Sequence, residues 1–284
     1  MTMFLGTGIG LTTSRRGSSG GPAPTFTPAA MFAAGETGAW YDPSDRSTMF
    51  QDTAMTIPVT AHNQPVGVMR DKSGNGIHLI APNDGARPVY QETGNRQRLA
   101  FFDEEKMLVS SNTFLTRTED DSVYLAAATD NTSLSKSWCP IAIGDGVTRA
   151  GTGNRFAISY FTSVGSATNY ISELRDASSL SYRMNKIATA DDQTHYEDFY
   201  VPAGAQPSSP PVAVSSQIDG QALSQSANDG PDPIVASMKV GLGTFNFSTP
   251  AANDINYWYG GIVVLRSMTQ SDRDKLRIFF STSH

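Results

Sequence analysis

Hydrophobic and polar positions alternate over many short runs of this chain, and the pattern predicts a β-protein. About ten runs are rich in aromatic and β-branched residues and end at turn residues, which is typical of strands. They cover residues 98–102, 107–110, 122–127, 138–143, 155–161, 168–174, 196–201, 212–218, 237–241 and 257–265. Turn sequences such as Asp-Gly and Pro-Ser-Ser-Pro separate them. We therefore predict an all-β, antiparallel sandwich rather than an α/β fold.

A short helix is expected near the start of this β-region. Thr27 can cap it, Pro28 suits its first position, and Gly35 can close it, because a proline is tolerated at a helix start and a glycine favours a helix end. The sequence thus predicts a helix over residues 27–35.

A second helix is expected at the C-terminus. Thr269 can cap it, with Asp272 at the third position, and Leu276, Phe279 and Phe280 recur on one face. A helix with one apolar face buries that face against another element. We expect this helix to pack on the sandwich.

Residues 1–26 differ in composition from the rest of the chain, being rich in glycine and serine. Such a segment loses much backbone entropy on ordering, so we predict a flexible anchor that a partner orders. The residues that mark this anchor are Gly6, Gly8, Gly10, Arg15 and Arg16. Residues 27–284 then form one β-domain, because no linker divides them.

Charge and composition narrow the classes of partner. The 284 residues carry a formal net charge of −6, which argues against binding to the phosphate backbone of nucleic acids. No run of about 18 apolar residues is present, so no membrane insertion is expected. The single cysteine, Cys139, excludes an internal disulfide and is expected to be a small buried hydrophobe.

No pattern in the chain supplies the groups of a catalytic site. The four histidines have no zinc-ligand spacing, and no Gly-x-Ser-x-Gly motif is present. Acidic residues occur as adjacent pairs, and neighbouring residues in a strand point to opposite faces, which makes them a poor acid and base pair. We expect no catalytic residue and a protein that is not an enzyme.

The loop at residues 71–76 contains oxygen-bearing side chains around two glycines. Asp71, Ser73 and Asn75 could bind a hard cation such as calcium. The loop lacks the closing acidic residue of an EF-hand, and Asp and Asn also stabilise turns through the backbone. We therefore favour a structural turn and expect no cofactor. Calcium bound by this loop is the alternative.

Aromatic side chains gather at two places and could stack on sugar rings. The candidate glycan-binding residues are Trp40, Tyr41, Tyr257, Trp258 and Tyr259. In a strand, Tyr257 and Tyr259 share one face and Trp258 takes the other. At least one of these faces is therefore expected to belong to the core.

Several short blocks, taken in order, resemble the laminin-G/concanavalin-A-like jelly-roll modules of tailed-phage and prophage virion proteins. These blocks are residues 39–45, 65–67, 71–76, 87–90, 217–220, 239–241, 257–264 and 269–272. The resemblance covers roughly residues 36–284. It implies a two-sheet jelly roll in which Asp219 and Gly220 turn a hairpin, Gly260 and Gly261 lie in the last core strand, and the final helix closes the fold.

The resemblance also implies a function without catalysis. It implies a fibre, spike or decoration subunit of a virion, assembled in the bacterial cytoplasm and bound to other virion proteins through its N-terminal segment. Some members of the family bind host-surface polysaccharide, and a homo-oligomer is expected by analogy. The alternatives are a lectin without a structural role and a polysaccharide-degrading enzyme on the same fold.

Overall fold

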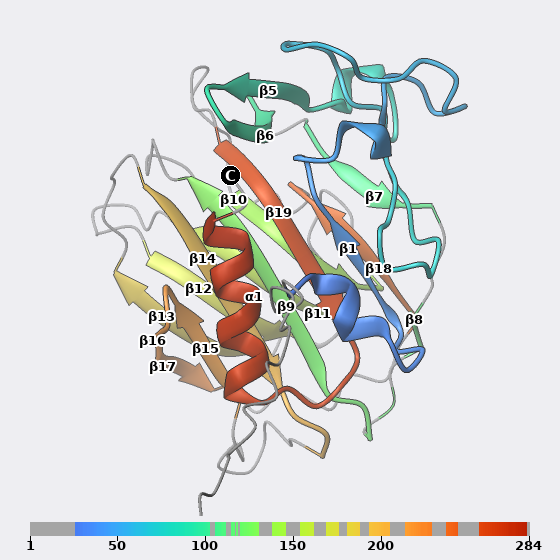
Figure 1. The fold of residues 1–284 in the computed structure, drawn as a ribbon. Coiled ribbons are helices and arrows are strands. Elements are labelled where there is room, and N and C mark those ends of the chain that lie inside the picture. Colours follow the sequence, from blue (N-terminus) through green and yellow to red (C-terminus); the bar gives the residue numbers. More distant parts are fainter. Residues whose placement is uncertain are drawn as a thin grey trace, which may run out of the picture.

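The computed structural model describes residues 26–102, 106–111, 115–116, 118, 120–130, 138–145, 154–161, 169–175, 181–187, 193–204, 214–228, 237–243 and 256–282. Within these residues the chain forms an eight-stranded and an eleven-stranded sheet, and the strand pairs are antiparallel. Figure 1 shows the helix α1 (Gln270–Thr282) lying across the first of these sheets. The predicted fold class, a two-sheet antiparallel jelly-roll sandwich with a short N-terminal and a C-terminal helix, is confirmed.

The eight-stranded sheet has the long strands β9 and β19 at its centre. In spatial order its strands are β16 (Gln221–Ala222), β15 (Ser215–Ile218), β14 (Thr194–Val201), β9 (Val123–Asp130), β19 (Asn256–Val264), β6 (Arg96–Phe101) and β5 (Val89–Thr93), and β1 (Gly38–Tyr41) also pairs with β19.

The eleven-stranded sheet forms the other layer. In spatial order its strands are β17 (Ser224–Asn228), β13 (Ser181–Ile187), β12 (Asn169–Arg175), β11 (Arg155–Phe161), β10 (Trp138–Gly144), β18 (Ser237–Leu242), β7 (Leu108–Ser110), β4 (Leu79–Ile80), β3 (Val68–Met69) and β2 (Met49–Phe50), and β8 (Leu115–Thr116) also pairs with β18.

All ten predicted runs contain a strand, and the residues 155–161 match β11 in full. The pattern missed β13, because its arginine and lysine lie among tyrosine and methionine and weaken the apolar signal. It also missed short strands such as β3 and β4, whose two residues each are too few for an alternation to be recognised.

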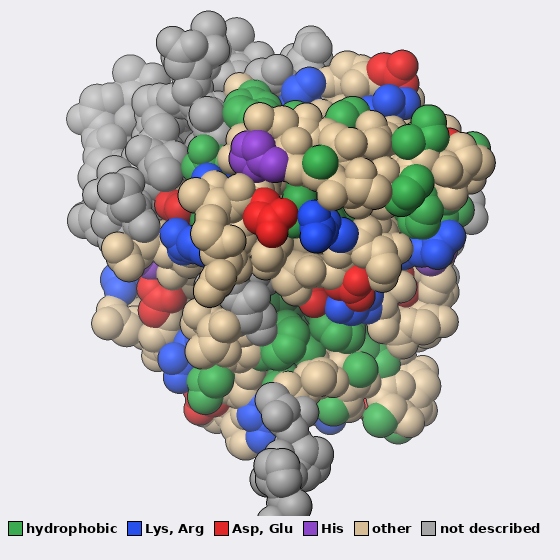
Figure 2. All heavy atoms as spheres, turned by 45° about the horizontal axis from the view of Figure 1, so that its top comes forward, with side chains coloured by type: hydrophobic (Ala, Val, Ile, Leu, Met, Phe, Trp, Pro, Cys, Tyr) green, Lys and Arg blue, Asp and Glu red, His purple; other side chains and the backbone are tan. Residues whose placement is uncertain are grey.

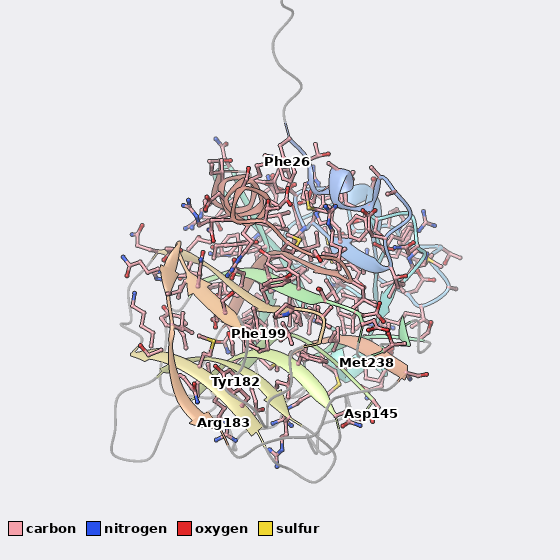
Figure 3. The ribbon with its side chains drawn as sticks, turned by 90° about the horizontal axis from the view of Figure 1, so that it is seen from below. Phe26, Asp145, Tyr182, Arg183, Phe199 and Met238 are labelled. Atoms are coloured by element: carbon pink, nitrogen blue, oxygen red, sulfur yellow. The ribbon has the colours of Figure 1, made fainter. Side chains whose placement is uncertain are left out.

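The main core lies between the sheets. Figure 3 shows the two layers edge-on, with Phe199 and Tyr182 directed into the space between them. Trp258, Tyr41 and Phe101 are also fully buried there. Burial of such large side chains is the main favourable contribution to folding.

A second apolar cluster covers the outer face of the eight-stranded sheet. It combines Leu276 and Phe280 of α1 with Tyr196 of β14 and Ile262 of β19. The predicted cap of α1 is confirmed, because the Asp272 backbone N–H donates to Thr269 Oγ1 at 3.1 Å, and Thr269 Oγ1 in turn lies 2.9 Å from Asp272 Oδ2. The prediction that α1 packs on the sandwich is therefore correct.

The N-terminal helix differs from the expectation over residues 27–35. The structure has a 3-10 helix, η1 (Pro28–Phe32), in which Thr27 makes no side-chain cap hydrogen bond. Two further 3-10 turns occur at η2 (Arg46–Thr48) and η3 (Asp84–Ala86). The helix is shorter than predicted because its apolar side chains Met31 and Phe32 are already buried in the second apolar cluster within one turn.

The two glycine features implied by the family resemblance are present. Asp219 and Gly220 both have positive φ, at 51° and 81°, and join β15 to β16, which suits a tight hairpin turn. Gly260 and Gly261 lie in β19. The anchor residues Gly6, Gly8, Gly10, Arg15 and Arg16 lie outside the described residues.

Candidate functional site

Four of the five aromatic residues proposed for sugar stacking are buried. Tyr41 and Trp258 are fully buried between the sheets, Tyr259 is fully buried on the outer face of the eight-stranded sheet, and Trp40 is 6% exposed. Trp40 also packs edge-on against Phe279 of α1, with ring centroids 6.0 Å apart. These four rings contribute to folding and do not form a stacking platform. Tyr257, which is partly exposed, is the exception.

The loop of Asp71, Ser73 and Asn75 is held by hydrogen bonds from the protein itself. Asp71 Oδ1 accepts from the backbone N–H groups of Trp40 (3.0 Å) and Ser73 (2.8 Å), and Oδ2 accepts from the Ser73 hydroxyl (2.7 Å) and the Ile77 N–H (3.2 Å). Asn75 Nδ2 donates to the carbonyl of Gly38 at 2.8 Å. The oxygens of Asp71 are thus committed to a turn that fastens the loop to β1, as the favoured interpretation predicts. No cluster of three potential metal-ligating side chains occurs in the described part of the chain.

Tyr257 belongs to a group of four residues on the neighbouring strands β6 and β19. Arg96 and Arg98 lie two residues apart in β6, and Tyr257 and Tyr259 lie two residues apart in β19. Tyr257 is paired with Ala100, which sets the register of the two strands. Because side chains alternate between faces, all four point to the outer face of the eight-stranded sheet. We call this group the arginine–tyrosine face.

The guanidinium groups of this face lie over the tyrosine rings. Arg98 Cζ is 3.5 Å from the centroid of the Tyr257 ring, and Arg96 Cζ is 4.9 Å from that of Tyr259. A cation over an aromatic face is attracted by the negative potential of the ring. The stacking therefore holds both planar cations against the sheet.

Hydrogen bonds fix Arg98 further. Its Nη1 donates to the hydroxyl of Tyr259 at 3.0 Å, and that hydroxyl donates to Asp130 Oδ2 at 3.3 Å. Its Nη2 lies 3.4 Å from Gln91 Oε1. Burial raises the pKa of the Tyr259 phenol, so the hydroxyl stays neutral and links the cation to the carboxylate.

The charges of the arginine–tyrosine face do not cancel. Asp130 Oδ2 lies 4.0 Å from Arg98 Nη1, whereas no carboxylate of the described residues lies within ion-pairing distance of Arg96, whose Nη2 instead contacts Thr194 Oγ1. Within the described residues, two guanidiniums thus face one carboxylate. Acidic and basic side chains are interspersed on the face of the protein drawn in Figure 2, and the whole chain has a formal net charge of −6.

The arrangement can bind an anion that also has a flat apolar surface. Arg96 and Tyr257 are partly exposed, and the side chain of Arg98 is 13% exposed. A guanidinium offers paired N–H donors that match a carboxylate. Side chains that accept or donate hydrogen bonds, Gln91 and Thr194, border the cations.

The sequence analysis found the tyrosines of this face and missed the arginines. The available signal was Arg-x-Arg at residues 96–98, because in a strand this spacing places both cations on one face. The predicted run began at residue 98 and left Arg96 out, whereas β6 begins at Arg96. Their proximity to Tyr257 and Tyr259 depends on the pairing of β6 with β19, which lie about 160 residues apart in the chain.

Glu173 is a buried carboxylate on the eleven-stranded sheet, away from the arginine–tyrosine face. Glu173 is fully buried, its Oε2 accepts from Arg155 at 2.6 and 2.9 Å, and its Oε1 accepts from Arg183 at 2.8 Å. These cations lower the pKa of Glu173, although burial alone would raise it. Both carboxylate oxygens are therefore engaged in ion pairs on the eleven-stranded sheet.

Comparison with known proteins finds solved structures that share the fold. No protein-family model and no curated protein matches the sequence. The botulinum neurotoxin serotype G binding domain is similar, with a TM-score of 0.55 and 12% identity over 75% of this chain and 49% of that chain. The binding domain of Paraclostridial Mosquitocidal Protein 1 has a TM-score of 0.50 and 10% identity, over 74% and 49%.

An arabinofuranosidase complexed with arabinofuranosyl-alpha-1,2-xylobiose is also similar. Its TM-score is 0.50 with 14% identity, over 91% of this chain and 65% of that chain. This chain spans about half the length of the toxin domains it matches. At these identities the comparisons support the β-sandwich fold.

Proposed function

We propose that this chain is a non-enzymatic carbohydrate-binding β-sandwich that recognises acidic polysaccharide through the arginine–tyrosine face. The observation that carries the proposal is the pair of guanidiniums, Arg96 and Arg98, held over Tyr257 and Tyr259 with one carboxylate beside them. A uronate or sialate sugar has a carboxylate for a guanidinium and an apolar ring face for the exposed part of Tyr257. The similar structures include a toxin binding domain and an arabinofuranosidase complexed with a sugar, and this supports the proposal.

The binding test uses alginate and polysialate as acidic probes and dextran as the neutral probe. Wild-type protein should bind the acidic chains saturably, and added salt should weaken the binding because it screens exposed charges. Arg96→Gln should lower the affinity about tenfold, since charge-assisted hydrogen bonds contribute roughly 1.5–3 kcal/mol. Dextran should give no saturable signal.

The control is Arg70→Gln. Arg70 is exposed and also lies over an aromatic ring, that of Phe50, at 4.5 Å, but it follows β3 of the eleven-stranded sheet. This variant should bind as wild type does. Equal losses in the Arg70 and Arg96 variants would point to general charge attraction and overturn the assignment of the site.

We place the protein in a virion or phage-like particle as part of the same proposal. This role is supported by the resemblance of the ordered blocks from residue 39 to residue 272 to virion modules. In such a particle the protein is a fibre, spike or decoration subunit. It forms a homo-oligomer and contacts other virion proteins through residues 1–26. Particles produced without this protein should lack an appendage in negative-stain images, and particles of unchanged shape would contradict the virion role while leaving the binding test intact.

Glycoside hydrolysis is the alternative, favoured by the arabinofuranosidase that matches over 91% of this chain. Glu173 is the fully buried carboxylate on the outer face of the eleven-stranded sheet, and its two oxygens are held by Arg155 and Arg183. A carboxylate held in this way is a poor nucleophile or proton donor. Release of reducing ends from arabinoxylan or alginate would establish the enzyme in place of the binding protein.

A further inference from the structure

A groove lies on the outer face of the eleven-stranded sheet, on the other layer from the arginine–tyrosine face. Ile80 of β4 and Val109 of β7 are paired across the strands, and Val109 is paired with Gly241 of β18. Leu79 and Leu108, which alternate with them, belong to the core. Ile80 and Val109 therefore point away from the core, and Gly241 beside them leaves room for a depression.

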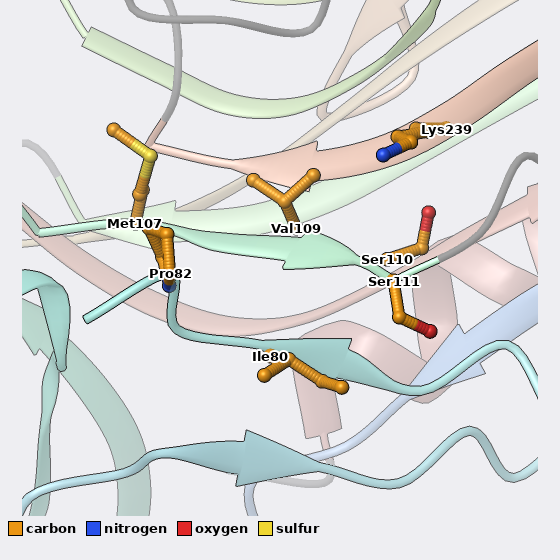
Figure 4. A pocket seen from close by; sticks show the side chains of 7 residues that line it. All are labelled: Ile80, Pro82, Met107, Val109, Ser110, Ser111 and Lys239. Atoms are coloured by element: carbon orange, nitrogen blue, oxygen red, sulfur yellow. The ribbon is translucent and has the colours of Figure 1, made fainter. Parts of the chain in front are cut away.

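The groove has a volume of about 320 Å³ and an apolar floor. Ile80, Pro82, Met107 and Val109 contribute hydrocarbon surface, and Ser111 lies at one end. Figure 4 shows Ile80 and Val109 on neighbouring strands, with Met107 and Pro82 at the opposite end from Ser111. The volume is at the lower end of the range for small-molecule sites, roughly 300–1,000 Å³.

Among the described residues that line this groove, Lys239 is the one that carries a charge. It lies on the same face as Gly241, and its partner across the strands is Gly144, which has no side chain to cover it. No carboxylate within the described ranges lies within ion-pairing distance of its ammonium. Figure 4 shows the ammonium beside Val109. Lys239 is half-buried, and an ammonium next to an apolar floor favours an anion that is attached to an apolar body.

We propose that this groove binds a small amphiphilic carboxylate, with the apolar body on Ile80, Met107 and Val109 and the carboxylate on Lys239. Burial of the apolar body supplies attraction without direction, and the charge-assisted hydrogen bond fixes the orientation. The site is independent of the proposed polysaccharide site, since the two lie on different sheets.

The test compares octanoate with 1-octanol as calorimetric probes of the full chain. Octanoate should bind saturably and about tenfold more tightly than 1-octanol, because the alcohol lacks the charge. Lys239→Met should remove this difference, and Lys239→Arg should retain most of it. Val109→Glu should abolish binding of both probes, because it places a carboxylate in the apolar floor.

The matched control is Lys275→Met, which removes an exposed ammonium from α1 on the other sheet and should leave binding of both probes unchanged. Thermal melting of each variant separates lost binding from lost folding. Equal affinity of wild type for the two probes, or a Lys239→Met variant that keeps the preference for octanoate, would overturn the proposal. Loss of alginate binding in that variant, with no octanoate binding by wild type, would assign Lys239 to polysaccharide instead.

Discussion

The guanidinium of Arg273 in α1 makes a two-point ion pair with the carboxylate of Asp198 in β14. Arg273 Nε lies 3.1 Å from Asp198 Oδ2, and its Nη2 contacts Oδ1. Arg273 Nη1 also donates to Ser215 Oγ at 2.8 Å. Both side chains are nearly buried, with 6% and 3% exposed. This contact joins the last helix to the middle of the eight-stranded sheet.

Arg273→Ala should lower the free energy of unfolding by about 3–5 kcal/mol, because removal of one partner leaves the Asp198 carboxylate buried without its counter-charge. Urea unfolding followed by tryptophan fluorescence measures the change. Lys275→Ala, two residues further along α1 at an exposed site, should have little effect. A loss below 1 kcal/mol in the Arg273 variant would mean that water reaches Asp198 freely.

The stability of the protein should depend on pH through Glu197. This residue shares the core-facing side of β14 with Phe199, is 1% exposed, and has an Oε2 without a hydrogen-bond partner. Burial, followed by the charges of Asp198 and Asp219, raises its pKa well above 4.5, although the Ser172 hydroxyl opposes this shift. The folded state therefore holds a proton that the unfolded state releases.

The proton on Glu197 determines whether the stability rises or falls with pH. Above about pH 4.5 the unfolded state binds fewer protons, so the Glu197 contribution to the free energy of unfolding decreases as the pH rises toward the folded pKa. Glu197→Gln cannot titrate. Its stability relative to wild type should increase with pH, by up to about 1.4 kcal/mol per pH unit. Denaturant unfolding from pH 4 to pH 8 measures this, and a difference that does not change with pH would refute a raised pKa.

Gly260 should tolerate no side chain. Its φ is 148°, and a Cβ atom there would lie 2.8 Å from Phe280 Cε1 and 3.2 Å from the carbonyl oxygen of Tyr41. Gly260→Ala should cost about 3 kcal/mol through backbone strain and overpacking.

Gly94→Ala is the control for Gly260→Ala, because Gly94 also has a positive φ, 61°, but nothing lies within 4 Å of a Cβ at that position. It should cost about 1 kcal/mol, from backbone conformation alone. Thermal melting of both variants gives the comparison. Equal losses would show that Phe280 moves aside without cost.

The proposed polysaccharide site predicts a gain of affinity from the removal of Asp130. Its carboxylate lies 4.0 Å from Arg98 Nη1 and reduces the positive potential there. Asp130→Asn should increase affinity for alginate several-fold, since the Coulomb energy at that distance is on the order of 1 kcal/mol in water. Asp274→Asn on α1 should leave the affinity unchanged. Weaker binding in the Asp130 variant would mean that its carboxylate serves the site by orienting Tyr259 and Arg98.

Local sequence determined much of the fold. Ten apolar runs predicted strands that the structure contains, and Thr269 with Asp272 predicted the start of α1. Alternation in β19 predicted that Trp258 would point away from Tyr257 and Tyr259, and Trp258 lies in the core between the sheets. These features depend on neighbours within a few residues, which is the range over which strand and helix periods act.

Tertiary structure decided which faces are covered and which strands meet. Trp40 appears as one aromatic among several in the sequence, and its burial under Phe279 depends on where α1 docks. Arg96 and Arg98 meet Tyr257 and Tyr259 because β6 pairs with β19, and Lys239 faces an apolar groove because β18 lies beside β7. The local sequence of a strand sets the face to which each side chain points. The residue that it meets on that face belongs to a strand far away in the chain, and no local pattern encodes which strand that is.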